Sequence, residues 1–153
     1  MLYLVRHAKA GSRSDWSGDD RLRPLSNKGR RQSELLAERL APLAKGELVS
    51  SPYLRCIETL QPLAARIDGA VRADERLGED MSFEGALALL AEVPDGSVLC
   101  SHGDVIPATI GALQRRGCRI VGEPEWRKAS VWVLTRTDDT ITTAEPQPPP
   151  ADE

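Results

Sequence analysis

Short apolar runs alternate with stretches of helical periodicity along most of this chain. Residues 2–5, 48–51 and 97–101 favour β structure, and the first and the last of these runs are followed at once by Arg6 and His102. Continuous apolar runs of this length are typical of parallel strands buried on both faces. The intervening stretches predict helices at residues 28–43, 52–64, 83–92 and 105–116. This alternation predicts an α/β fold, a three-layer sandwich with a mostly parallel central sheet flanked by helices.

The C-terminal part of the chain has a different pattern. Residues 131–134 and 140–143 favour strands joined by an Asp-Asp turn, which predicts a hairpin that adds an antiparallel edge to the sheet. Residues 145–153 hold four of the 11 prolines, and we expect this tail to be extended or disordered. Because 153 residues suit a single domain, the predicted organisation is one domain over residues 1–144 followed by the tail.

Charge and composition exclude several classes of partner. The chain has 20 Lys and Arg residues against 23 Asp and Glu, and this net charge of -3 disfavours a broad nucleic-acid or anionic-membrane surface. The three scattered cysteines do not suit a disulfide framework or a zinc site. The sequence shows neither a signal peptide nor an apolar stretch long enough to span a bilayer. We therefore expect a cytoplasmic protein without a metal site and without nucleic-acid or membrane partners.

Both histidines of the chain directly follow predicted strands. His7 comes after the first strand, next to Arg6, and His102 comes after the strand at 97–101. Arg55 lies in the helix that follows the second strand. A single histidine or arginine is more often a structural or solvated residue than a catalyst. Here all of them occur at strand ends, where open α/β sheets bind ligands, and their chemistry suits an anion.

Four ordered blocks resemble the histidine phosphatase, or phosphoglycerate mutase-like, superfamily. Residues 4–8 read LVRHA, which is similar to the family's LVRH(G/A) signature. Residues 24–32 resemble its L(S/T)xxGxxQ segment, and residues 51–59 resemble its SSPxxRxxxT block. Residues 101–103, Ser-His-Gly, resemble its second histidine block. Together the blocks cover most of residues 1–111, so the resemblance concerns most of the chain.

Two branches of this superfamily are the most similar. Residues 6–11 and 20–25 resemble the short SixA-type phosphohistidine phosphatases. Residues 126–132 resemble the phosphatase-like domain of actinobacterial Nudix-linked proteins, although this chain has no Nudix box. The resemblance implies a metal-independent phosphatase without a cofactor, acting on phosphohistidine protein or a small phosphoester. The alternatives are a phosphatase for a nucleotide or sugar phosphate and a phosphate-binding regulatory module with little turnover. The superfamily's mutases are considerably longer.

The resemblance also implies roles for individual residues. His7 is the expected nucleophile, which takes the phosphoryl group on a ring nitrogen. Arg6, Arg55 and His102 are expected to bind the phosphoryl oxygens and to stabilise the transition state. A cysteine phosphatase or a serine hydrolase is disfavoured, because the chain lacks both the C-x5-R loop and the G-x-S-x-G elbow that those mechanisms use.

The general acid is expected among the carboxylates of residues 73–80. Glu79 is favoured because Leu-Gly-Glu best matches the family's LxE, with Glu75, Asp80 or no acid at all as alternatives. A phosphohistidine substrate depends less on a general acid, since its leaving nitrogen can already carry a proton.

Several further polar residues are predicted near the substrate. The expected substrate-binding residues are Ser12, Arg13 and Arg23, while Arg21, Lys128 and Ser130 are other candidates for the rim of the pocket.

Overall fold

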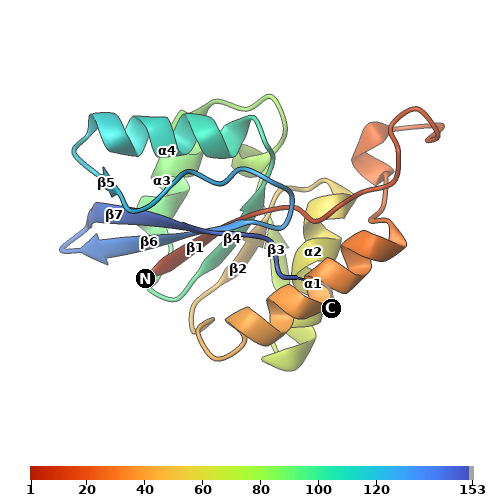
Figure 1. The fold of residues 1–153 in the computed structure, drawn as a ribbon, viewed down its shortest axis with the longest axis horizontal. Coiled ribbons are helices and arrows are strands. Elements are labelled where there is room, and N and C mark those ends of the chain that lie inside the picture. The colour runs from red at the N-terminus through yellow and green to blue at the C-terminus, as the bar shows by residue number, and fades with distance from the viewer. Residues whose placement is uncertain (152–153) are drawn as a thin grey trace.

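Seven strands form one mixed sheet in the computed structural model, which describes residues 1–151 (Figure 1). The strands are β1 (Leu2–Arg6), β2 (Leu48–Ser50), β3 (Val71–Ala73), β4 (Val98–Ser101), β5 (Arg119–Ile120), β6 (Val131–Thr137) and β7 (Thr140–Gln147). The α-helices are α1 (Asn27–Leu40), α2 (Leu54–Arg66), α3 (Phe83–Glu92) and α4 (Val105–Arg115). Two short 3₁₀ helices, η1 (Asp20–Leu22) and η2 (Glu75–Leu77), lie in the loops.

The helices cover the two faces of the sheet in pairs, as the predicted sandwich requires. Helices α1 and α2 lie against one face, and α3 and α4 lie against the other (Figure 1). Side chains of β1 alternate between the two cores: Leu4 packs with the α3–α4 side and Val5 with the α1–α2 side. Both faces of this strand are therefore buried, which explains its continuous apolar sequence.

The strand order β3-β2-β4-β1-β6-β7-β5 brings three parallel strand ends to the same edge. Strand β1 pairs in parallel with β4, with Arg6 opposite Ser101, and β4 pairs in parallel with β2, with Cys100 opposite Ser50. The residues that immediately follow these strands must then lie side by side. Those residues are His7, His102 and Ser51.

The loop after β1 is fixed against the start of α1. Ser26 caps this helix, as its hydroxyl accepts a hydrogen bond of 3.1 Å from the Gly29 amide. A Cβ atom at Gly29 would lie 1.8 Å from the Lys9 carbonyl oxygen, so only glycine allows this close approach. The Ser26 amide also donates to that carbonyl. The chain just beyond His7 is thus held in place by backbone contacts.

The hairpin and the tail differ from the prediction in position. β6 and β7 form the predicted antiparallel hairpin, but β6 pairs with β1 and the outermost strand beyond β7 is β5, which pairs with β7 in parallel. Strand β7 runs through Gln147, three residues past the predicted boundary at residue 144. Pro146 is tolerated there because the paired residues of β5 reach only Ala144, so the outer side of β7 needs no amide donor at this point.

Beyond the hairpin, the described part of the predicted tail lies against α1. The Pro148 carbonyl accepts a hydrogen bond of 3.1 Å from Arg39, near the end of that helix. Residues 152–153, the last two of the predicted tail, lie outside the described residues. Among residues 1–151, no helix combines the length and the apolar character that crossing a membrane would demand.

Candidate active site

A pocket of about 310 Å³ lies at the edge where β1, β4 and β2 end. It contains the five residues predicted to be catalytic, which come from four separate segments of the chain. Its lining residues are Arg6, His7, Arg13, Arg23, Arg55, Glu79, His102, Gly103, Asp104 and Lys128.

His7 is held in one tautomer. Its ring is buried, with 6% of the residue exposed, and Nδ1 lies 2.7 Å from the Ala8 carbonyl oxygen. A carbonyl oxygen only accepts hydrogen bonds, so Nδ1 carries the proton and Nε2 keeps its lone pair. The Ala8 amide in turn donates to the Thr59 hydroxyl at 3.0 Å, which fixes the peptide that orients the ring.

The surroundings of His7 also keep its ring neutral. Burial, with further contributions from the positive side chains of Arg55 and Arg6 and from His102, lowers the pKa of His7 from 6.5 to about 3, although the hydrogen bond to Ala8 opposes the shift. A neutral imidazole with a free Nε2 lone pair is the form that attacks an electrophile.

This shift predicts a pH dependence of stability. Between pH 6.5 and about 3 the unfolded chain protonates His7 and the folded chain does not, so His7 destabilises the fold as the pH falls. We expect its share of the free energy of unfolding to drop by up to about 1.4 kcal/mol per pH unit across this window. Denaturant titrations of wild type and His7→Gln from pH 8 to 4 would measure it. Parallel curves for the two proteins would contradict the prediction.

Arg55 is the most deeply buried cation of the pocket, with 1% of the residue exposed. Its Nη1 donates to the Asp20 carbonyl oxygen at 3.0 Å, and its Nη2 donates to the carboxylates of Asp20 at 3.2 Å and Glu79 at 2.8 Å. The guanidinium also lies over the Tyr53 ring, 4.9 Å from its centroid. These contacts fix the plane of the guanidinium, while its Nε has no hydrogen-bond partner among residues 1–151.

His102 is oriented by Ser51 from the neighbouring strand. The two side chains are 2.8 Å apart, from Ser51 Oγ to His102 Nε2. Ser51 Oγ also accepts a hydrogen bond from the Tyr53 amide, so its own proton is free to point at Nε2. This arrangement leaves Nδ1 as the protonated nitrogen of His102, and that atom is buried without a partner in the described chain.

The position of the Arg6 guanidinium depends on Gly103, the residue that follows His102. Its Nη1 donates to the Trp126 carbonyl oxygen at 2.6 Å, which anchors the outer end of the guanidinium. A Cβ atom at Gly103 would lie 2.6 Å from Arg6 Cζ, so the guanidinium packs where any larger residue would place its side chain. Arg6 Nε is buried, and it too lacks a partner within residues 1–151.

Three buried N–H groups of the pocket therefore have no protein partner. They are Arg6 Nε, Arg55 Nε and His102 Nδ1, and they are the only buried side-chain N or O atoms without a partner in the described residues. Buried donors are rarely left unsatisfied, and here all three belong to residues that line the same pocket as His7. Such a set of donors suits a tetrahedral oxyanion such as a phosphoryl group.

Among the three carboxylates proposed as general acid, only Glu79 lines this pocket. Glu75 forms an exposed ion pair of 3.0 Å with Arg21, away from His7. Asp80 is exposed, and its amide donates to Asp104. The structure thus favours Glu79 on position, and Arg55 holds its carboxylate in place.

The three predicted substrate-binding residues have different surroundings. Arg13 lines the pocket and lies 3.3 Å from Glu79, with most of its side chain exposed. Arg23 also lines the pocket, but it is buried and donates to Asp20 and to the Gly11 carbonyl oxygen, so it holds the loop. Ser12 does not line the pocket: it is exposed, and its hydroxyl is 2.8 Å from that of Ser14.

The three other candidates for the rim of the pocket have different positions. Lys128 lines the pocket, whereas Ser130 is buried and Arg21 is occupied by Glu75. Sequence analysis assigns no role to Ser51 or Gly103. Both residues lie in the blocks that resemble the family, and that resemblance is the signal that could have identified them.

A family comparison matches residues 2–86, more than half of the chain, to the histidine phosphatase superfamily (branch 1). The 8-oxo-(d)GTP phosphatase of Mycolicibacterium smegmatis is 34% identical over 158 residues, which cover 97% of this chain and 48% of that protein. The chain thus spans about half the length of this curated relative.

Solved structures agree with this match. A putative phosphohistidine phosphatase SixA from Nakamurella multipartitia is 28% identical, with a TM-score of 0.70 and coverage of 95% of this chain and 92% of that one. The protein histidine phosphatase SixA complexed with tungstate is 21% identical, with a TM-score of 0.74 and coverage of 94% and 92%, and it supports the fold alone. The predicted fold and family are confirmed, and the chain belongs to the histidine phosphatase superfamily (branch 1).

Proposed function

We propose that this chain is a metal-independent phosphatase that works through a phosphorylated His7, with a phosphohistidine protein or a small phosphoester as substrate. The observation that carries the proposal is the pairing, in one pocket, of a neutral His7 with three partnerless buried N–H donors. The guanidinium groups of Arg6 and Arg55 supply the positive charge that phosphoryl transfer requires.

The reaction has two steps. The lone pair of His7 Nε2 attacks phosphorus, the bond from phosphorus to the leaving oxygen or nitrogen breaks, and Glu79 gives the leaving atom its proton. Water then attacks the phosphorus of phospho-His7, Glu79 takes the proton of that water, and the bond to Nε2 breaks. Inorganic phosphate leaves, and His7 and Glu79 return to their starting states. Arg6, Arg55 and His102 hold the phosphoryl oxygens in both steps.

The relatives support two substrate classes. The 34% identical relative is named for 8-oxo-(d)GTP, and the 28% identical structure is described as a putative phosphohistidine phosphatase. Substrates of both classes carry an anionic phosphoryl group, and the three buried donors can bind such a group. The choice between them is a matter for direct assay of a phosphohistidine protein, a small phosphoester and a nucleotide side by side.

A trapping experiment in EDTA tests the mechanism. Wild type should release phosphate from an aryl phosphate, and alkaline quenching followed by mass spectrometry should find phosphate on His7. The isomer should be the Nε2 one, because Nδ1 is committed to Ala8. His7→Gln is the control and should take no label. Phosphate release without label on His7, or loss of release in EDTA, would overturn the proposal. Binding of phosphate without release would indicate a regulatory module.

Substitution of Glu79 should separate substrates by their leaving groups. We expect Glu79→Gln to lower kcat by about 10²-fold for an alkyl phosphate, whose leaving oxygen needs a proton, and much less for an aryl phosphate. Steady-state kinetics with both substrates would measure the two ratios. Glu75→Gln is the matched control, because it makes the same chemical change at an exposed ion pair. An equal loss for both substrates would mean that Glu79 acts only by holding Arg55.

A further inference from the structure

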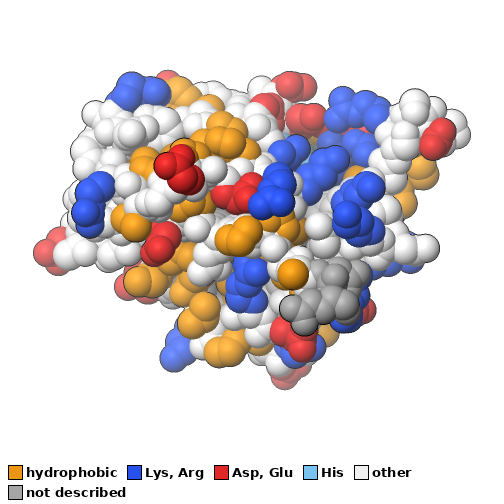
Figure 2. Space-filling model, in the orientation of Figure 1, with side chains coloured by type: hydrophobic (Ala, Val, Ile, Leu, Met, Phe, Trp, Pro, Cys, Tyr) orange, Lys and Arg blue, Asp and Glu red, His pale blue; other side chains and the backbone are white. Residues whose placement is uncertain are grey.

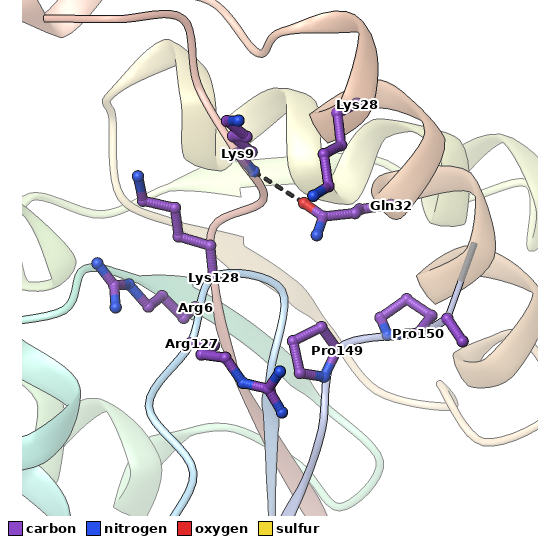
Figure 3. A pocket seen from close by; sticks show the side chains of 9 residues that line it. Arg6, Lys9, Lys28, Gln32, Arg127, Lys128, Pro149 and Pro150 are labelled. Carbon is purple, nitrogen blue, oxygen red and sulfur yellow. Dashed lines mark hydrogen bonds between the residues drawn. The ribbon is translucent and has the colours of Figure 1, made fainter.

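A second cavity adjoins the catalytic pocket and shares two of its residues. It has a volume of about 710 Å³, and Arg6 and Lys128 line both cavities. Figure 3 shows it between the loop after β1, the start of α1 and the loop before β6. We call it the basic groove and define it by Arg6, Lys9, Lys28, Gln32, Arg127 and Lys128. The tail residues Pro149 and Pro150 form its remaining wall (Figure 3).

The positive charges of the basic groove are not neutralised by the protein. The ammonium groups of Lys9, Lys28 and Lys128 make no hydrogen bond or ion pair among residues 1–151, and no Asp or Glu lines the groove. Arg127 pairs with Glu125, and Arg6 is attracted by the nearby negative charge of Asp104. Figure 2 shows Lys and Arg side chains gathered right of centre on this face. Such a concentration of charge is unexpected in a chain of net charge -3, and it attracts anions.

The position of Lys128 shows how close these charges lie to the reacting centre. Burial, and then the positive charges of Arg6, Arg23 and Lys9, lower the pKa of its ammonium group. Mutual repulsion of this kind costs stability, and an anion bound between the two cavities would relieve it.

The groove is also built on rigid elements and offers a neutral donor. Lys28 and Gln32 are four residues apart and so lie on the same side of α1. The side-chain oxygen of Gln32 accepts a hydrogen bond of 3.0 Å from the Lys9 amide (Figure 3). Its NH₂ group is thereby left for a ligand, and the same bond holds the loop that carries Lys9.

We propose that the basic groove binds a second phosphate of the substrate, so that the enzyme acts on a small molecule with a diphosphate or longer phosphate chain. This rests on the proposed function, because the terminal phosphoryl group is the one that lies at His7. Arg6 and Lys128 line both cavities and would lie against neighbouring phosphates of one chain.

The reaction of such a substrate needs no reagent other than water and the residues of the site. His7 Nε2 forms a bond to the terminal phosphorus, the phosphoanhydride P–O bond breaks, and the departing phosphate keeps the electron pair. A departing phosphate is a weak base, so it needs no proton from Glu79. The lysines of the groove stabilise the negative charge that develops on it. Water then attacks the phosphorus of phospho-His7, the bond to Nε2 breaks, and the proton of that water passes to the carboxylate of Glu79 and from there to solvent.

Binding of two non-hydrolysable probes tests this proposal independently of turnover. Methylphosphonate fills only the catalytic pocket, whereas methylenediphosphonate carries the second phosphonate that reaches the basic groove. Calorimetry should give wild type a clearly lower Kd for the diphosphonate. The double variant Lys9→Ala/Lys28→Ala should lose at least about tenfold in diphosphonate affinity, as expected for charge-assisted contacts. Its affinity for methylphosphonate and its aryl phosphatase activity should stay unchanged.

The matched control is Lys45→Ala/Arg66→Ala. It removes two exposed positive charges that have no partner in the described chain, and neither residue lines the groove. Equal affinities of wild type for the two probes, or an equal loss in the control, would overturn the proposal. So would stronger competition by a hexaglutamate peptide than by the diphosphonate, since the groove would then recognise acidic protein. Hydrolysis of an aryl phosphate, measured separately, tests the proposed phosphatase function and does not depend on the basic groove.

Discussion

Replacing His7 with alanine is expected to reduce phosphate release by at least about 10⁴-fold, because the variant has no atom that can carry the phosphoryl group. The three donors Arg6 Nε, Arg55 Nε and His102 Nδ1 remain in place, so phosphate should still bind. The measurement is kcat on an aryl phosphate, with phosphate affinity determined by calorimetry on the same protein.

The control for this variant is its fold. The His7 ring is buried and packs edge-on against His102, with ring centroids 5.4 Å apart, so its removal leaves a cavity. Circular dichroism and a thermal melt should show a folded protein. A folded variant that keeps more than a tenth of wild-type kcat would contradict the role of His7 as nucleophile.

Replacing Arg55 with alanine should give the second largest loss. We expect kcat/KM to fall by about 10²–10³-fold, the usual effect of removing one preorganised donor to a developing oxyanion. The variant also removes the cation that pairs with the Asp20 carboxylate, and this carboxylate would then repel an incoming phosphate. Steady-state kinetics over a range of aryl phosphate concentrations would separate the effect on kcat from that on KM.

The Arg55→Lys variant distinguishes charge from geometry. Lysine keeps the positive charge but lacks the planar group that contacts Asp20 and Glu79 while presenting Nε. We expect it to recover less than about a tenth of the activity lost in Arg55→Ala. Full recovery would show that only the charge of Arg55 matters. Arg72→Ala, at an exposed ion pair with Glu47, should leave the kinetics unchanged.

The sequence was sufficient to predict the residues that follow the central strands. Apolar runs indicate buried parallel strands, and such strands end at a common edge, so His7 and His102 were expected to meet. Arg55 was expected there for the same reason, as it follows β2 in the first turn of α2. These predictions depend only on local periodicity and on the direction of the strands.

The loops were not predictable in the same way. Glu75, Glu79 and Asp80 lie within six positions, and the contact of Glu79 with Arg55 is a long-range feature that local periodicity does not reveal. Ser12 lies in a polar loop without periodicity, where nothing in the sequence fixes which side chains turn inward. Loop positions of this kind are decided by long-range contacts.

The tail shows a different limit of sequence reasoning. Its high proline content predicts an extended or disordered segment from residue 145, but composition cannot show whether an amide donor is needed at a given position. Pro146 lies opposite Trp132 of β6, at a point where β7 has no paired residue on its other side. Proline is acceptable there, so the strand continues to Gln147.

The central place of β1 has a consequence for biosynthesis. Strand β1 leaves the ribosome before its partners β4 and β6, which begin at Val98 and Val131. The segment Leu2–Arg6 therefore stays unpaired until β4 has emerged, and the pocket around His7 cannot assemble before then. Long-range parallel pairing is slow and leaves aggregation-prone segments exposed. Conditions that slow elongation or saturate chaperones should therefore reduce the yield of active enzyme before they affect the stability of molecules already folded.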